Sequence, residues 1–245
     1  MFVEIFAITV LSFISNIIGT VSSFGVGTVV TPILLLFMPF DQTILLVCII
    51  HWFHDIFKWY FFRHGFDMKL FLSFGIPTIF ATVIGAKLVT AEQSEVLTSL
   101  LGLFLIFSVV LMYFVEKFRV PQNWVTGTIG GLLSGFFAGI FGIRGAVLSV
   151  FMAAFDLRKA TFIGTTGAIS LLLDTARFGV YIWDGIRISQ PLVYALTLFV
   201  PASFLGAYCG SRLVHLIPQA QFRNVVAFFL LIVGVKLLLT PWIGW

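Results

Sequence analysis

Long apolar stretches dominate the chain, and short breaks containing polar residues, glycine or proline separate them. A helix needs about 20 mostly apolar residues to cross a bilayer. Reading from break to break gives ten apolar segments, at residues 2–21, 26–39, 42–62, 68–89, 95–115, 123–141, 145–155, 160–183, 189–213 and 222–241. Two of them, 26–39 and 145–155, are short for a full span, and each follows a glycine-rich break. The pattern predicts an all-α polytopic membrane protein in which these two segments form tight helical hairpins or broken, partly re-entrant elements.

The composition supports a lipid rather than an aqueous environment. Of the 245 residues, 60% are hydrophobic and 10% are charged, whereas soluble domains carry about 25% charged residues. So few charges cannot cover the surface of a soluble protein of this length, and a disordered chain would need low hydrophobicity. The 22 glycines fit a membrane helix bundle, because glycine is commoner in membrane helices than in soluble ones.

The basic residues gather on one side of the membrane if all ten segments cross it and the N-terminus lies outside. That side receives Arg63, Lys69, Lys117, Arg119, Arg158, Lys159, Arg212 and Arg223. The other side receives Arg144, Arg187, Glu92 and Glu95. An excess of Lys and Arg is typical of cytoplasmic loops, so we expect a multi-pass protein of the bacterial inner membrane. The net charge of +4 includes no run of Lys or Arg, and nucleic acid is not an expected partner.

The second half of the chain repeats features of the first half in the same order. The matched features are the glycine breaks 24–27 and 141–145, the stretches 85–89 and 210–214, and the pairs Asp55–Lys58 and Asp174–Arg177. Five segments are an odd number, so the two repeats, residues 1–116 and 117–245, would have opposite orientations in the membrane. Inverted repeats with a substrate site at their interface are typical of secondary transporters.

These features resemble the sulfite exporter TauE/SafE family of membrane permeases. That family carries two copies of a glycine-rich motif, roughly G-x-x-G-x-G-G-G, followed by an apolar run and often a proline. The copies here are residues 22–27, with Pro32 after them, and residues 139–145. The resemblance spans nearly the whole chain. It implies export of sulfite or small organosulfonates, with substrates that differ among members.

The two glycine breaks are the candidate substrate sites. In lipid every backbone N–H and C=O needs a partner, so an unwound segment persists only where protein buries it or water reaches it. Glycine permits unwinding, and helix N-termini with accessible N–H groups bind anions. The candidate ligands are Ser22, Ser23, Gly25, Gly27, Thr28, Gly142, Arg144 and Gly145. The alternative is that these glycines serve only close helix packing.

Three residues depart from the family's motif. Thr28 stands where another glycine is typical, Arg144 interrupts the second glycine run, and Ser149 stands where proline is common. A guanidinium suits an oxyanion because it offers several donors in a fixed fork. Arg144 is therefore expected to bind the anionic substrate. The alternative is an ordinary outer-loop arginine whose side chain reaches the lipid headgroups.

A second group of ionisable residues lies inside apolar segments, where such side chains are costly and usually functional. It comprises His51, His54, Asp55 and Lys58, which are spaced to share one helical face, and the later pair Asp174 and Arg177. Three interpretations stay open. The group could couple transport to protons, since histidine titrates near neutral pH. His51, His54 and Asp55 could bind a metal ion, or the ion pairs could be purely structural.

Together these observations favour a secondary transporter of a small anion that works by alternating access between the repeats. No G-x-x-x-x-G-K-[ST] motif for ATP occurs, so an ion or substrate gradient would supply the energy. The main alternative is a cation or metal transporter that uses His51 and His54. No H-E-x-x-H or G-x-S-x-G motif occurs, so neither catalysis nor a cofactor is expected. The expected partners are the lipid bilayer and the anion, and a homo-oligomer is compatible with these features.

Overall fold

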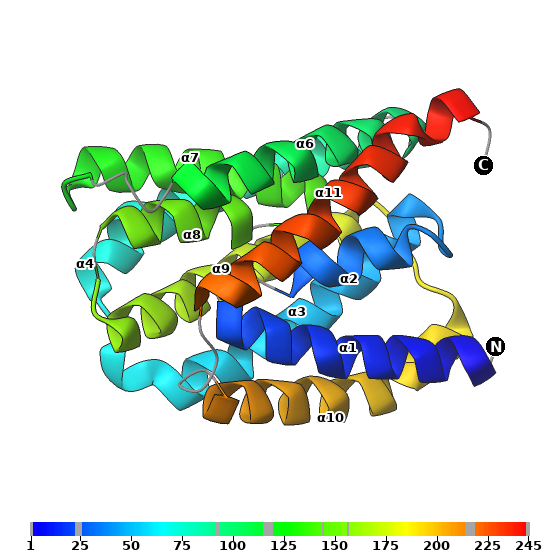
Figure 1. The fold of residues 1–245 in the computed structure, drawn as a ribbon, viewed down its shortest axis with the longest axis horizontal. Coiled ribbons are helices and arrows are strands. Elements are labelled where there is room, and N and C mark those ends of the chain that lie inside the picture. Colours follow the sequence, from blue (N-terminus) through cyan, green and yellow to red (C-terminus); the bar gives the residue numbers. More distant parts are fainter. Residues whose placement is uncertain are drawn as a thin grey trace.

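The computed structural model describes residues 2–22, 26–91, 94–114, 120–143, 145–155, 157–213 and 219–243. Every element of secondary structure in these ranges is helical (Figure 1). The helices are α1 (Phe2–Ser22), α2 (Gly27–Leu34), α3 (Phe40–Phe62), α4 (Met68–Leu70), α5 (Ile76–Ala91), α6 (Ser94–Phe114), α7 (Trp124–Phe141), α8 (Gly145–Ala154), α9 (Lys159–Trp183), α10 (Gln190–Leu213) and α11 (Gln219–Ile243). A 3₁₀ turn over Arg63–Gly65 follows α3, and a π-helical turn over Phe71–Gly75 joins α4 to α5.

These helices coincide with the apolar segments of the sequence, the segment 68–89 running through α4, the π-helical turn and α5. Four described stretches are long and apolar enough to cross a membrane: Phe40–Gly65, Met68–Val89, Trp124–Phe141 and Gln190–Leu213. Shorter apolar helical stretches are Ile5–Thr20, Val96–Leu111 and Leu230–Leu239. The all-helical membrane fold predicted from the hydrophobic pattern is therefore confirmed.

Helices α2 and α8 are too short to cross a bilayer. They contain 8 and 10 residues, which at about 1.5 Å per residue gives lengths of about 12 and 15 Å. The hydrocarbon core is about 30 Å thick. A Cβ on Gly19 would lie 2.6 Å from a methyl group of Val26, so the start of α2 packs against the C-terminal part of α1. The short segments are thus half-length helices.

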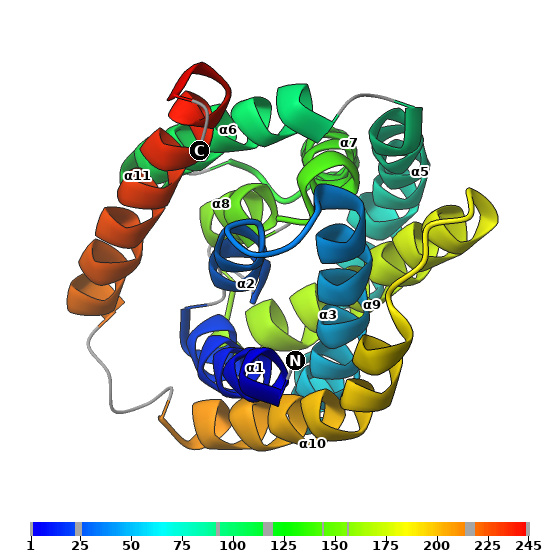
Figure 2. The same cartoon turned by 90° about the vertical axis from the view of Figure 1, so that its right-hand side faces the viewer.

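The most extensive helix packing joins the two halves of the chain. Helix α5 packs against α7, α1 against α10, α6 against α11 and α3 against α9. Figure 2 shows three of these pairs around the edge of the molecule, with α2 and α8 nearer its centre. Each pair takes one helix from before residue 116 and one from after it. Residues 1–116 and 117–245 therefore interlock in a single packed body.

Glycine makes this close packing possible, because membrane helices associate through small residues and van der Waals contact. A Cβ on Gly85 of α5 would lie 2.5 Å from the carbonyl oxygen of Phe136 on α7, and one on Gly102 of α6 would lie 2.6 Å from that of Gly234 on α11. Thr82 on α5 also donates a 3.2 Å hydrogen bond to the carbonyl oxygen of Gly135 on α7. Each helix backbone thus sits directly against its partner.

Several helix termini that lie next to basic residues gather at one end of the molecule. The end of α3, α4, the end of α8 and the starts of α7 and α9 lie toward the end opposite the N-terminus (Figure 1). Lys69 lies in α4, Arg63 directly follows α3, and Arg158 directly precedes α9. At the other end, Lys87 on α5 forms an ion pair with Asp184 after α9. Three of the eight basic residues expected in the cytoplasm thus lie toward one end of the bundle, and the shared location of all eight stays a prediction.

Candidate functional site

The two glycine breaks, which lie far apart in the sequence, meet in the structure. Gly27 begins α2 and is buried. A Cβ at this position would lie 2.6 Å from the carbonyl oxygen of Gly142, and it would collide with the imidazole ring of His51 on α3. The first break therefore touches both the second break and the ionisable face of α3. Only glycine fits between them.

The second break is shaped by a left-handed residue. Gly142 follows α7 with a φ of 69°, a conformation that glycine adopts without strain. Its N–H donates to the carbonyl oxygen of Ala138, 2.9 Å away, which closes the last turn of α7. A Cβ on Gly142 would lie 2.8 Å from Nη2 of Arg177. The guanidinium of Arg177 thus lies against the unwound backbone.

Several predicted ligands fall outside what the structure describes. Ser23, Gly25 and Arg144 lie outside the described residues, as do the side chains of Ser22 and Thr28. Gly145 begins α8 and is buried. The assignment of these residues to substrate binding stays a prediction. What the structure adds is that both short helices start close to the contact between Gly27 and Gly142.

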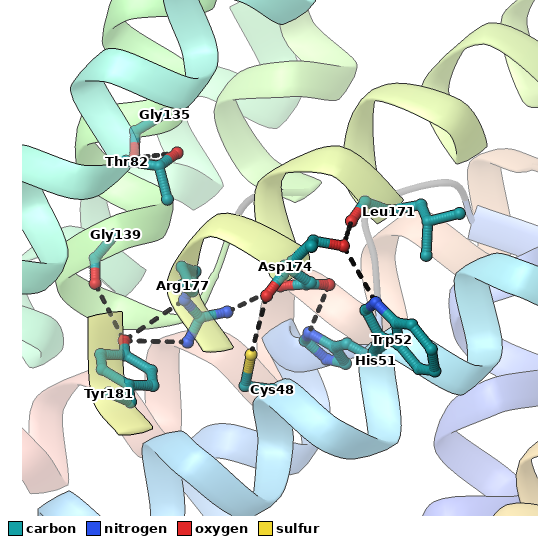
Figure 3. Close-up of polar contacts among 11 residues, drawn as sticks. Cys48, His51, Trp52, Thr82, Gly135, Gly139, Leu171, Asp174, Arg177 and Tyr181 are labelled. Carbon is teal, nitrogen blue, oxygen red and sulfur yellow. Dashed lines mark hydrogen bonds and ion pairs between the residues drawn. The ribbon is translucent and has the colours of Figure 1, made fainter. Parts of the chain in front are cut away.

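Arg177 is the centre of a buried polar network on α9 (Figure 3). Its Nη1 donates a 2.9 Å hydrogen bond to Oδ1 of Asp174, one turn earlier, and both side chains are fully buried. Its Nε and Nη2 donate to the Tyr181 hydroxyl at 3.3 and 3.2 Å. That hydroxyl donates onward to the carbonyl oxygen of Gly139 on α7, 3.1 Å away. The network links α9 to the last turn before the second break.

Helix α3 meets the same network from the other side. Nδ1 of His51 lies 4.0 Å from Oδ2 of Asp174, and the thiol of Cys48 donates to the backbone carbonyl oxygen of Asp174 at 3.4 Å. Farther along the interface, Nε1 of Trp52 donates to the Thr175 hydroxyl at 3.0 Å. The two membrane helices that carry the predicted ionisable residues are therefore neighbours, and the His51 imidazole faces the Asp174 carboxylate.

The predicted shared face of α3 is confirmed by burial. His51, His54, Asp55 and Lys58 are each at most 4% exposed, as expected for side chains three and four residues apart on one side of a helix. Among the described residues, no three His, Cys, Asp or Glu side chains gather into a group that could hold a metal ion. Ionisable groups at this depth in a membrane helix usually pair or line a substrate path.

The sequence reasoning missed two members of the network. Tyr181 lies four residues after Arg177 and Cys48 three residues before His51, so each shares a helical face with a residue that was singled out. The tyrosine hydroxyl was the available signal, because a buried hydroxyl needs a hydrogen-bond partner. Gly139 is part of the second glycine motif. Its carbonyl oxygen accepts a hydrogen bond from the Tyr181 hydroxyl, a contact that depends on the packing of α7 against α9.

These features define an α-helical membrane protein with two glycine breaks that converge beside a buried, charged network. The chain belongs to the sulfite exporter TauE/SafE family, whose model matches residues 8–237. The resemblance drawn from the glycine motifs is thereby confirmed.

Relatives of the chain have been described as transporters. The probable membrane transporter protein MJ0441 of Methanocaldococcus jannaschii is 25% identical over 260 residues, which cover 94% of this chain and 94% of that protein. The probable membrane transporter protein MamO of Paramagnetospirillum magneticum is 24% identical over 131 residues. MamO of Magnetospirillum gryphiswaldense is 23% identical over 133 residues. The chain spans 20% of the length of each MamO protein. No solved structure matches it.

Proposed function

We propose that the chain is a secondary membrane transporter of a small anion, with sulfite or a small organosulfonate as the substrate. The observation that carries this proposal is the contact between the two glycine breaks, where Gly27 lies against the carbonyl oxygen of Gly142. The guanidinium of Arg177 lies on the other side of Gly142. One location therefore combines unwound backbone, the starts of two short helices and the buried Arg177–Asp174 ion pair.

Electrostatics favours an anion at this location. The N-terminal end of a helix carries about half a positive charge and has free N–H donors. Two such ends, those of α2 and α8, begin near the contact. The charge of Arg177 is offset by Asp174, so the helix ends and Arg144 are the positive groups left to attract substrate. The hydroxyls of Ser22, Ser23 and Thr28 would add donors for sulfur oxyanions.

Inverted repeats would account for the way in which the helices pair. The pairing of α1 with α10 becomes that of α7 with α5 when the two halves are exchanged, and the pairs α3–α9 and α6–α11 map onto themselves. The half-length helices α2 and α8 correspond as well. This reciprocity supports two five-segment repeats of opposite orientation, which are typical of alternating-access transporters.

The close packing between helices of the two halves limits which parts of the molecule could move during transport. If residues 1–116 rocked as one rigid body against residues 117–245, the contacts of Gly85 with Phe136 and of Gly102 with Gly234 would have to separate. Packed interfaces of this kind do not deform continuously. In our proposal the moving units are therefore pairs of helices drawn from both repeats, which slide past the half-length helices α2 and α8 to open the site to either face.

His51 and Asp174 are the proposed coupling groups. They come from different repeats and lie 4.0 Å apart. His51 adjoins the first break at Gly27, and Asp174 binds Arg177, which adjoins the second break at Gly142. A proton that binds at this point would change the charge beside the anion site. His54 and Asp55 on the same helical face, together with Arg177, complete the set of residues proposed for coupling. The proposed location is the bacterial inner membrane, and the basic end of the bundle would face the cytoplasm.

The proposal is tested by uptake into proteoliposomes. Radiolabelled sulfite, sulfate, thiosulfate, a short organosulfonate and a divalent metal ion would be compared for the wild type and Arg144→Ala. Arg187→Ala is the matched control, because Arg187 is an exposed arginine at the end of the bundle assigned to the outside. We expect saturable uptake of a sulfur anion that falls at least tenfold in Arg144→Ala and is unchanged in Arg187→Ala.

The other outcomes would revise the proposal in different ways. Anion uptake that is equal in all three proteins would remove Arg144 from the substrate site and leave the anion transporter standing. Uptake of the divalent metal ion, with no uptake of any anion, would overturn the anion function and direct attention to His51 and His54.

A further inference from the structure

One turn of α1 contains three buried oxygen atoms that have no hydrogen-bond partner. Ser12, Ser15 and Asn16 are each 0% exposed. Ser12 Oγ, Ser15 Oγ and Asn16 Oδ1 accept and donate no hydrogen bond. Ser12 lies three residues before Ser15 and four before Asn16, so each of these two side chains shares a helical face with Ser12. Buried polar atoms are normally paired. Ser108 on α6 shows the usual solution, with its hydroxyl donating to the Phe104 carbonyl oxygen at 2.7 Å.

The orientation of Asn16 decides what kind of ligand could satisfy these atoms. Its Nδ2 donates to the carbonyl oxygen of Ser12 at 2.6 Å and to the hydroxyl of Ser203 on α10 at 3.3 Å. A side-chain amide has two N–H donors, so both are used and Oδ1 is left as an acceptor. Reversing the amide would set Oδ1 against the Ser12 carbonyl oxygen, where two acceptors repel. A ligand at Asn16 must therefore be a cation or a donor, and an oxyanion does not fit.

We propose that Ser12 Oγ, Ser15 Oγ and Asn16 Oδ1 bind a monovalent alkali cation, for which Na⁺ is the probe. Hard cations take oxygen ligands such as hydroxyls and amide carbonyls. All three ligands are neutral, so they do not compensate for the dehydration of a divalent ion. Hydroxyl and amide groups also do not change protonation state near neutral pH. The site therefore differs in chemistry from the histidine-containing network on α3 and α9.

The location of this cation site suits a role in coupling. It lies one turn before Gly19, which packs against Val26 at the start of α2. It also adjoins α10, because a Cβ on Gly206 would lie 2.7 Å from Cβ of Asn16. A bound cation would hold α1 and α10 in one arrangement beside the break. This role in coupling rests on the proposed transport function, whereas cation binding itself does not.

Binding of ²²Na⁺ to the purified full chain in detergent, with no anion present, tests the site. The test variant is Ser12→Ala/Ser15→Ala, because neither hydroxyl forms a hydrogen bond and their removal leaves the helix contacts in place. Ser108→Ala is the control, since that hydroxyl is equally buried and already paired. We expect saturable binding to the wild type and Ser108→Ala, and at least a tenfold loss of affinity in the double variant. Absent binding, or equal affinity in all three proteins, would overturn the site.

A second measurement separates this inference from the proposed function. Sulfite uptake into proteoliposomes would be compared with an inward Na⁺ gradient and with a choline gradient. We expect Na⁺ to accelerate uptake severalfold in the wild type and to have no effect on the double variant. Na⁺ binding without uptake of any anion would keep the cation site and overturn the anion function. Equal anion uptake in both gradients would overturn the coupling role and keep the anion function.

Discussion

Gly142 and Arg177 lie in direct contact, with Gly142 in the left-handed conformation at a φ of 69° and Nη2 of Arg177 2.8 Å from the place where a Cβ would stand. This contact joins the two kinds of residue that the sequence marked as unusual. One is a glycine in a break, and the other is a charged residue inside a membrane segment. Their meeting identifies the centre of the bundle as the candidate site.

Gly142→Ala is expected to destabilise the fold by about 2 kcal/mol. A left-handed φ costs an L-residue about 1–2 kcal/mol, and the methyl group would also displace the Arg177 guanidinium. Thermal unfolding in detergent measures the effect. Gly179→Ala is the control, because Gly179 is helical and a Cβ there would meet nothing within 4 Å. That change should stabilise α9 by up to about 1 kcal/mol. Equal unfolding midpoints for the two variants would contradict the strain assigned to Gly142.

Removing one partner of the Asp174–Arg177 ion pair is expected to lower the free energy of unfolding more than removing both partners. Asp174→Asn leaves the Arg177 guanidinium without its 2.9 Å carboxylate partner, and an uncompensated buried charge costs about 3–5 kcal/mol. The double change Asp174→Asn/Arg177→Gln removes both charges and should recover part of this loss. Chemical unfolding of Asp174→Asn, Arg177→Gln and the double variant completes a thermodynamic cycle with the wild type. Additive losses would show that the pair contributes no coupling energy.

Gly85 on α5 and Gly210 on α10 test the internal repeat. Each sits against the backbone or Cβ of its partner helix, with Phe136 O 2.5 Å from a Cβ on Gly85 and Thr20 Cβ 2.7 Å from a Cβ on Gly210. Substitution of either by alanine overpacks an equivalent helix pair and should cost about 1–3 kcal/mol. Thermal unfolding of the two variants gives the comparison. A large loss in one variant and none in the other would argue against an equivalence of the two positions.

His51→Gln is expected to flatten the pH dependence of anion uptake between about pH 5 and 8. Histidine is the side chain that ordinarily changes charge in this interval, and His51 faces Asp174 across the α3–α9 interface. Uptake would be measured in proteoliposomes at matched internal and external pH. His64→Gln serves as the control, because His64 is an exposed histidine in the turn after α3. A wild-type pH profile in His51→Gln would remove that residue from the coupling site.

The orientation in the membrane can be tested with single cysteines placed in a protein in which Cys48 and Cys209 have been replaced. We expect a cysteine at Gly185, in the turn after α9, to react with a membrane-impermeant thiol reagent in intact cells. A cysteine at His64, at the basic end of the bundle, should react only after the cells are opened. Labelling of both from the same side would contradict the predicted topology, and the reverse pattern would invert it.

Much of the fold was predictable because a helix that spans a membrane must satisfy its backbone internally and its length is set by the bilayer. The segment 68–89 was therefore recognised even though a π-helical turn interrupts it at Phe71–Gly75. That turn itself was not predicted. It lies where Gly131 of α7 packs against the Phe74 carbonyl oxygen, a contact between residues far apart in the chain.

The candidate site was predictable in its residue types and only partly in its geometry. Glycine-rich breaks, where a helix can unwind, identified Gly27 and Gly142. Ionisable groups in apolar segments identified His51, Asp174 and Arg177, because such groups are costly in lipid and usually functional. Their distances from one another depend on which helices become neighbours. The contact of Gly27 with both Gly142 and His51 could not be derived from spacing along the chain.

The sequence by itself determined the class of protein, the positions of its helices and the identity of its unusual residues, since hydrophobicity and helical period act locally along the chain. Only the tertiary structure decided that α1 pairs with α10 and α5 with α7, that Tyr181 connects Arg177 to Gly139, and that oxygens of Ser12, Ser15 and Asn16 are left without partners. These features arise where side chains from distant segments compete for the same buried space and the same hydrogen bonds, and that competition is resolved only when the helices pack.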